Sequence, residues 1–571
     1  MGTSGIEAEQ RRSFDDERFA HPAPRFTQAL AGLSDARLTL LAALALFVLA
    51  AWPLLLVALP PYQDLPNHVA TAHIIAHPDL YPQFVFNGLF KSNCLLTLWF
   101  HLFGRFGLFG AARAFTAVVL AANAVALPIF VLRFAGRRAL PAAMLFAWPL
   151  VHSFSVTMGF LNFGFAFALA LVLLALLDQQ RQPEGATVGR GLAIALVAGV
   201  LWYAHPFPLA VVGALVALHV ATRASWPARL SAAVALLAPL APAALLSLTA
   251  ARQHLVKAEH ATTAAAATFS YLNPWELIAH LWTDVSGALT RWGATTIVPA
   301  LLLPVFVWTW RHRTPRRAFL SGPAMVLLAA AYVALPVMLS NWWYLNCRLV
   351  PFLWAGLLVR LPSTLPRPAA VALVVSALSF SAATGADYLR LDRDRAAFTA
   401  GVDAVPARAT LLPLMFEHAR TSDFTASLTH AWGYYTVSKD TSAPLVFAVE
   451  RSYAITYREF PPRALIPPAL DRFAESFATP AQVCRALRRI PSDAACEATW
   501  RELWSGFWRE AEPRFTHVLT WAMPSEARAL IPARYRRVFA AAALEIYARD
   551  DREYKQYDRR PDNSTNDPPS E

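Results

Sequence analysis

Long apolar runs, many of them near the length that crosses a lipid bilayer, follow one another through the first 385 residues of this chain. A transmembrane helix needs about 20 apolar residues. We expect about eleven such helices, at 39–59, 107–133, 139–157, 159–177, 191–204, 207–221, 229–249, 294–310, 319–339, 344–360 and 368–385. The run 92–103 is too short to span and predicts an interfacial helix.

Residues 191–221 allow two interpretations. One is a single kinked span, and the other is a pair of short helices that meet at the "HPFP" of 205–208. The pair fits better, because a single span would place Arg190 and Arg223 on opposite sides of the membrane. Short, broken helices are tolerated where they line a cavity instead of facing lipid.

The composition agrees with a membrane protein. Of the 571 residues, 56% are hydrophobic and 15% are charged, against about 25% charged in ordinary soluble domains. The formal net charge is +12, but the arginines occur in small clusters between the apolar runs. No basic stripe interleaved with aromatic residues is evident, which argues against a nucleic-acid partner.

The arginine clusters predict the orientation, because cytoplasmic loops are enriched in Lys and Arg. The N-terminal tail, residues 133–138 and "RHRTPRR" at 311–317 are all basic. They lie on one side if the N-terminus is cytoplasmic and the C-terminal region is extracytoplasmic. The polar start of the chain lacks the apolar core and cleavage site of a signal peptide, so we expect the first span to remain as an anchor, in a bacterial inner membrane.

Four segments are expected: a cytoplasmic tail at 1–36, a multi-span domain at 37–385, an extracytoplasmic α/β domain at 386–550 and a disordered tail at 551–571. In the α/β domain, 407–416, 443–450, 515–523 and 537–549 are predicted strands, and 468–478 and 497–511 resemble helices. Cys484 and Cys496 could form a disulfide outside the cytoplasm or remain two thiols. The fold class is therefore mainly α: a polytopic helical membrane protein with this α/β domain.

With this orientation, several unusual polar residues fall on the extracytoplasmic side. Asp64, His68 and His73 lie in "PPYQDLPNHVATAHII", directly after the first span. Pro66 favours a helix start with Asp64 as its cap, and His73 would then lie on a different face from His68. One interpretation is a capped interfacial helix with solvated histidines. The other is that Asp64 is a general base, or that a divalent metal is bound with help from His68 or His73.

Three further residues are expected on the same side. Asn162 lies in "GFLNFGFA" near the outer end of its span, His205 at the break between the short helices, and Arg348 in "NCRLVPF". Each is a candidate substrate-binding residue, as is His68. Arg348 suits a phosphate because a guanidinium binds it in a bidentate manner; the alternative is contact with ordinary lipid headgroups. His205 could instead only bond a carbonyl freed at the helix break.

The later outer loop contains "YLNPWELIAH" at 271–280. Asn273 is a preferred helix cap and Pro274 a preferred first helical residue. Glu276 is then expected to support the helix start electrostatically, and we assign it no chemistry.

Taken together, these features resemble the GT-C superfamily of integral-membrane glycosyltransferases, which includes protein O-mannosyltransferases and lipid A aminoarabinose transferases. The resemblance lies in the single first span, the acid of "YQDLPNH" directly after it, the interfacial helix, the broken helices and the outer C-terminal domain. It covers residues 37–385 as architecture, and "YQDLPNH" is also similar to segments of uncharacterised bacterial membrane proteins. The chain departs from the superfamily in lacking a second acid beside Asp64, since Leu65 follows it.

The resemblance implies a polyprenyl-phosphate sugar donor, transfer of a hexosyl group to an acceptor glycan, lipid or protein on the extracytoplasmic face, and Asp64 as the base. Arg348 would contact the donor phosphate. Two alternatives remain: a transporter or flippase for a lipid-linked or envelope substrate, and a non-catalytic scaffold of GT-C-like architecture. A transporter would typically carry internal repeats and ionisable residues near the middle of the membrane, and neither is evident.

Overall fold

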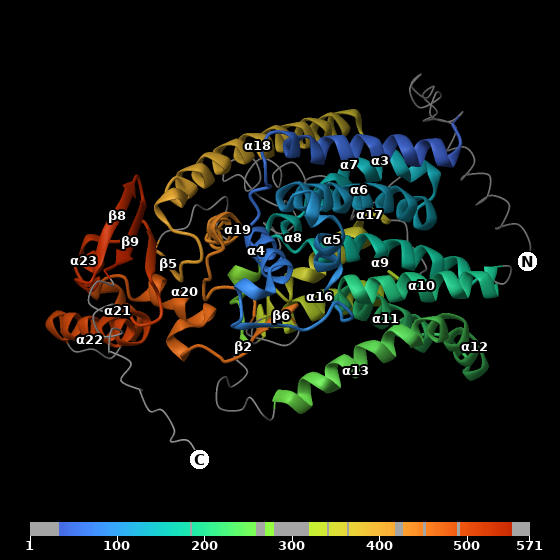
Figure 1. The fold of residues 1–571 in the computed structure, drawn as a ribbon. Helices are drawn as coiled ribbons and strands as arrows, with labels where there is room; N and C mark the ends of the chain where they lie inside the picture. Colours follow the sequence, from blue (N-terminus) through green and yellow to red (C-terminus); the bar gives the residue numbers. More distant parts are fainter. Residues whose placement is uncertain are drawn as a thin grey trace, which may run out of the picture.

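The computed structural model of the chain describes residues 33–182, 185–258, 269–278, 319–339, 342–361, 365–416, 426–448, 453–487 and 492–550. The expected span at 294–310 and nearly all of both expected tails lie outside these residues. Figure 1 shows the two parts of the fold, a bundle of apolar helices and a smaller sheet-containing region formed by the end of the chain.

Six helical segments of the described chain are long and apolar enough to cross a membrane. They are α3 with η1 (Asp35–Leu55), α6 (Leu108–Phe134), η4 to α8 (Arg137–Thr157), α9 (Leu161–Gln180), α12 to α13 (Trp226–Thr249) and α18 with η9 (Arg367–Ala404). Four shorter apolar helical segments accompany them: α10 (Val188–Ala204), α11 (Pro206–Ala221), α16 (Gly322–Ala334), and η8 with α17 (Cys347–Leu358). The composition and the helices are thus those of an integral membrane protein. Ten of the eleven segments that were expected to span lie in the described part of the chain, and each contains helix.

The chain does break into two helices at His205. This residue has extended backbone (φ −166°, ψ 126°), so α10 ends before it and α11 begins after it at Pro206. The Phe207 N–H donates to His205 Nδ1 at 3.2 Å. The imidazole therefore caps α11 and supplies an acceptor that the helix start needs.

Charged residues gather at the helix ends remote from His205. Asp178, in the last turn of α9, forms ion pairs with Arg133 at the end of α6 and with Arg181, at 2.5 and 2.6 Å. Arg137 pairs with Asp35 at the start of α3. These are the arginines that the sequence assigns to the cytoplasmic side.

Two helical predictions outside the bundle are confirmed. The interfacial segment contains α5 (Leu95–Phe103). Residues 274–278 are helical, Asn273 Oδ1 accepts from the N–H groups of Trp275 and Glu276, and Glu276 Oε2 accepts from the Asn273 N–H. This reciprocal pair is a capping box, so Glu276 does support a helix start.

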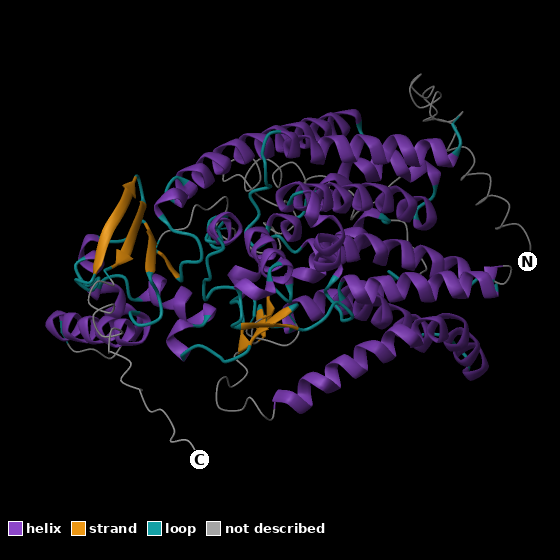
Figure 2. Ribbon diagram, in the orientation of Figure 1, coloured by secondary structure: helices purple, strands orange, loops and turns teal. Residues whose placement is uncertain are grey.

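The C-terminal region contains a four-stranded sheet in the order β5-β7-β9-β8 (Figure 2). Strands β5 (Leu411–Met415) and β7 (His517–Trp521) are parallel, whereas β9 (Leu544–Arg549) is antiparallel to β7 and to β8 (Tyr535–Ala541). Helices α20 (Pro467–Ser476), α21 (Pro480–Leu487), α22 (Asp493–Ala511) and the short α23 (Ser525–Arg528) accompany the sheet. The α/β character and both predicted helices are confirmed.

Two details of the strand prediction are wrong. Residues 537–549 form a hairpin instead of one strand, because Ala542 turns the chain with a positive φ of 50°. The described part of 443–450 is not a strand. The expected domain boundary at residue 386 falls inside α18, a continuous helix from Arg367 to Thr399.

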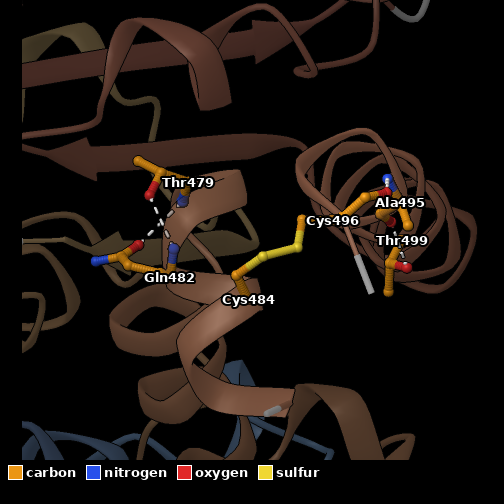
Figure 3. The surroundings of a disulfide bond; sticks show 7 residues. Thr479, Gln482, Cys484, Ala495, Cys496 and Thr499 are labelled. Atoms are coloured by element: carbon orange, nitrogen blue, oxygen red, sulfur yellow. Dashed lines mark hydrogen bonds between the residues drawn. A yellow bond between two sulfur atoms is a disulfide. The ribbon is translucent and has the colours of Figure 1, made fainter. Parts of the chain in front are cut away.

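Cys484 on α21 and Cys496 on α22 form a disulfide, with a Cα–Cα distance of 5.5 Å (Figure 3). Thr479 and Gln482 cap the start of α21 by exchanging hydrogen bonds. Of the two possibilities left by the sequence, the structure therefore has the bonded pair, which is typical of proteins outside the reducing cytoplasm. Cys94 and Cys347 are buried thiols outside this disulfide.

The loop after the first span and the C-terminal region are interleaved. Strand β1 (Phe84–Phe86) pairs antiparallel with β6 (Ile455–Tyr457), and helix α4 (Leu65–Ala76) packs on α19 (Gly433–Lys439). A second small sheet joins β2 (Phe269–Ser270), β3 (Met338–Leu339) and β4 (Trp342–Trp343). Residues far apart in sequence thus meet around α4.

Candidate functional site

Asp64 occupies the cap position of α4, as predicted, but its side chain does not cap the helix. Its side chain is 12% exposed, and Oδ1 lies 3.5 Å from His430 Nε2. An Asp at the cap position normally accepts a hydrogen bond from the first turn of its helix, so another group holds this carboxylate. Here that group is an imidazole from the C-terminal region.

The backbone at Asp64 is fixed by the turn that precedes α9. The N–H groups of Gln63 and Asp64 donate to the carbonyls of Thr157 and Met158, at 3.3 and 3.1 Å. Gly159 has φ +86°, and a Cβ there would lie 3.0 Å from the Asp64 Cβ and N. A glycine is therefore required for this close approach.

Side-chain hydrogen bonds secure the two residues that precede Asp64. The Tyr62 hydroxyl lies 2.6 Å from that of Tyr388 on α18, and His152 Nε2 lies 3.0 Å from the Tyr388 hydroxyl. The Ala426 N–H donates to Gln63 Oε1 at 2.9 Å. Three distant parts of the chain thus position one carboxylate.

Asn67, one turn after Asp64, connects α4 to the segment 445–447. Its Nδ2 donates to the Leu445 carbonyl at 3.0 Å and its Oδ1 accepts from the Phe447 N–H at 3.2 Å. Nδ2 also lies 3.5 Å from His430 Nδ1. If this amide donates to Nδ1, a neutral His430 carries its proton on Nε2 and directs it at Asp64.

His430 is 7% exposed and was not found from the sequence. It lies 366 positions from Asp64, in "LTHAWGYY", with no local motif around it. The only available signal was that a histidine in an apolar segment needs a partner.

His68 and His73 lie in different surroundings, as the predicted helix implied. His68 interacts electrostatically with Asp64 and His430, and burial lowers its pKa, with His430 adding to this effect and Asp64 opposing it. His73 Nε2 instead lies 2.8 Å from the Asp440 carboxylate, next to α19. The two metal candidates therefore do not share a site.

No group of three His, Cys, Asp or Glu side chains with metal-binding geometry occurs in the described part of the chain. The best fit is the pair Asp64 and His430, which is one ligand short of the three that catalytic zinc sites usually provide. The described residues thus do not fit a resident metal ion, and no step is assigned to one.

Arg348 is 8% exposed at the start of the helical segment that contains α17. Its guanidinium lies over the rings of Phe160 and Phe163, at 4.7 and 5.5 Å. Among the described residues no carboxylate forms an ion pair with it, although Asp64 is near enough to interact electrostatically. A buried positive charge without an ion-pair partner is costly.

His205 is the main polar neighbour of this guanidinium, with its Nε2 2.7 Å from an Arg348 terminal nitrogen. His205 Nδ1 also faces the Phe207 N–H. A neutral imidazole has a lone pair on only one ring nitrogen, so it cannot accept from both donors at once. Another terminal nitrogen of Arg348 donates to the Trp343 carbonyl at 3.4 Å, and Nε has no hydrogen-bond partner among the described residues. Within the described part of the chain the guanidinium thus has more N–H donors than acceptors, which is the arrangement that an anion would satisfy.

Asn162 has a different role from the one expected. Its Oδ1 accepts from the Leu96 N–H at 2.8 Å, and its Nδ2 donates to the carbonyl and the side chain of Asn93 at 2.9 and 3.0 Å. Both ends of the amide are therefore used to hold the start of α5. The structure assigns Asn162 to helix capping, and a contact with substrate stays only a prediction.

Comparison with family models and with the sequences of curated proteins finds no match. Among solved structures, the fold is similar to ArnT from Cupriavidus metallidurans in the apo state, with a TM-score of 0.49, 13% identity and coverage of 88% of this chain and 97% of that chain. For ArnT bound to undecaprenyl phosphate, the values are 0.46, 12%, 90% and 97%.

A third similar structure is the arabinofuranosyltransferase AftD from Mycobacteria, with a TM-score of 0.46, 15% identity and coverage of 90% of this chain and 42% of that chain. Likeness at this level does not determine a function, which has to be argued from the residues of the site.

Proposed function

We propose that this protein is a membrane glycosyltransferase that moves a hexosyl group from a polyprenyl-phosphate donor to an acceptor on the extracytoplasmic face. The observation that carries the proposal is a buried arginine without an ion-pair partner among the described residues, within electrostatic range of a buried carboxylate. A lipid phosphate supplies the missing negative charge at Arg348. Asp64 supplies a base close to it.

The acceptor hydroxyl attacks the anomeric carbon of the donor sugar while the bond from that carbon to the phosphate oxygen breaks. A new glycosidic bond forms, the lipid leaves as polyprenyl phosphate, and the hydroxyl proton passes to the Asp64 carboxylate. Arg348, oriented by His205, stabilises the negative charge that develops on the phosphate. A single displacement of this kind inverts the configuration at the anomeric carbon.

His430 serves Asp64 in this scheme. Its Nε2–H faces Oδ1 and fixes the carboxylate away from the cap of α4. General-base catalysis of this kind contributes about 10²- to 10⁴-fold to the rate. The disulfide of the C-terminal region favours an extracytoplasmic location, because such bonds persist in oxidising compartments.

The test is turnover of radiolabelled polyprenyl-phosphate hexoses by the purified protein in lipid, with an envelope extract as the source of acceptor. We expect turnover by the wild type and a loss of at least about 100-fold in Asp64→Asn. Asp79→Asn, an exposed carboxylate in η2 (Pro78–Leu80), is the matched control and should retain activity. Equal turnover in wild type and Asp64→Asn would remove Asp64 from the mechanism.

A further inference from the structure

Aromatic rings gather beside Asp64 on residues that the mechanism above does not use. Phe447 and Tyr453 are stacked, with ring centroids 5.6 Å apart and planes 18° from parallel. The His68 and His430 rings approach Phe447 edge-on, at 5.8 and 5.0 Å. We call the stacked pair Phe447 and Tyr453 the aromatic wall.

The aromatic wall is held in place from the first loop. Asn67 binds the backbone on both sides of Val446, through Leu445 and Phe447. The Tyr453 carbonyl accepts from Asn87 Nδ2 at 3.0 Å and from Lys91 Nζ at 2.9 Å. Rings fixed by backbone contacts of this kind are preorganised for a ligand.

The wall is close to both reactive groups. Its Phe447 end contacts His68 and His430, which both interact with Asp64. Its Tyr453 end is near enough to Arg348 to interact with it electrostatically. Phe447, Tyr453 and His68 are all half-buried, so each ring keeps an accessible surface.

In the proposed reaction the donor phosphate lies at Arg348 and the acceptor hydroxyl lies at Asp64. The transferred sugar lies between them. Small-molecule sites are typically lined by aromatic side chains with a few placed polar groups, and a pyranose in its chair form presents a face of C–H groups to such rings.

We propose that the aromatic wall binds the transferred sugar as a hexopyranose, through the C–H face of its ring. The proposal rests on the function proposed above and goes beyond it by assigning the sugar subsite.

The experiment measures Kd for the full-length protein in detergent with farnesyl phosphate and with farnesyl-phosphoryl glucose, galactose, mannose and N-acetylglucosamine. At least one conjugate should bind the wild type about five- to tenfold more tightly than farnesyl phosphate, as expected for one good aromatic contact. Phe447→Leu and Tyr453→Leu should abolish that gain and leave the Kd for farnesyl phosphate unchanged. Tyr453→Phe should keep the gain, as should the control Phe460→Leu, an exposed ring beside Tyr457.

Conjugates that bind no more tightly than farnesyl phosphate would overturn the sugar subsite, and so would a gain that survives in both leucine variants. Equal weakening of both probes by Phe447→Leu would also overturn it, because the ring would then act on the phosphate or the fold. If the wild type binds neither farnesyl phosphate nor any of its four sugar conjugates, the proposed function itself is contradicted.

Discussion

Gly433 is where α19 comes closest to α4, and its replacement by alanine tests whether that contact positions Asp64. A Cβ on residue 433 would lie 2.4 Å from the Pro66 carbonyl oxygen and 3.3 Å from the Ala70 Cβ. Real Cβ atoms stay at least 3.0 Å from such an atom, so the helices must separate by 3.0 − 2.4 = 0.6 Å or more. The atom to be moved belongs to the backbone two residues after Asp64, and no side chain can rotate to relieve the clash.

Overpacking of this kind typically costs about 1–3 kcal/mol of stability, and a displacement near 1 Å in a catalytic group can cost about 100-fold in rate. We therefore expect Gly433→Ala to lower the thermal midpoint by a few degrees and the donor turnover by one to two orders of magnitude. Turnover and thermal unfolding are measured on the same preparation. The matched control is Gly506→Ala on α22, where the nearest atom to the new Cβ is a side-chain nitrogen at 3.8 Å. Gly433→Ala with wild-type turnover would refute the idea that α19 positions Asp64.

Three further predictions follow from single contacts. The pKa of His68 is lowered in the folded protein, so its contribution to stability is complete above the unfolded pKa of about 6.5 and is lost as the pH falls from that value towards the lower pKa of the folded state. The drop in thermal midpoint from pH 7.5 to 5.5 should therefore shrink in His68→Gln and persist in the exposed control His101→Gln. Asn162→Ala removes the hydrogen bonds at the start of α5 and should lower the free energy of unfolding by about 1–3 kcal/mol. The Kd for farnesyl phosphate should not change. An unchanged stability with a raised Kd would instead make Asn162 a binding residue. Maleimide labelling of the denatured chain should modify two cysteines before reduction and four after it, since Cys484 and Cys496 form a disulfide and the other two are thiols. Four labels without reduction would exclude the disulfide.

The helices were predictable because burial in a bilayer depends on a run of apolar residues and on little else. The break at His205 and the cap at Asn273 were predictable for a different reason, since proline and cap residues act on their own backbone. Arg348 was recognisable because a charge within an apolar run is rare enough to be informative without knowing its neighbours.

The remainder depends on contacts between distant segments. The stretch 443–448 looked like a strand, but Asn67 satisfies part of its backbone, so it needs no ladder of β hydrogen bonds. The side chain of Asp64 turns away from its helix because His430 lies there, and nothing near residue 64 in the sequence indicates this. The aromatic wall was missed for the same reason, since only the fold brings the Phe447 ring to those of His68 and His430.

The most direct measurement is a structure of the full-length protein with a polyprenyl phosphate bound. The account predicts a phosphate whose oxygens lie about 2.7–2.9 Å from the Arg348 guanidinium, on the side where Nε now has no partner, with the lipid chain among the apolar helices and Asp64 still beside His430. A phosphate bound elsewhere, with Arg348 still hydrogen-bonded to His205 and the Trp343 carbonyl, would contradict it.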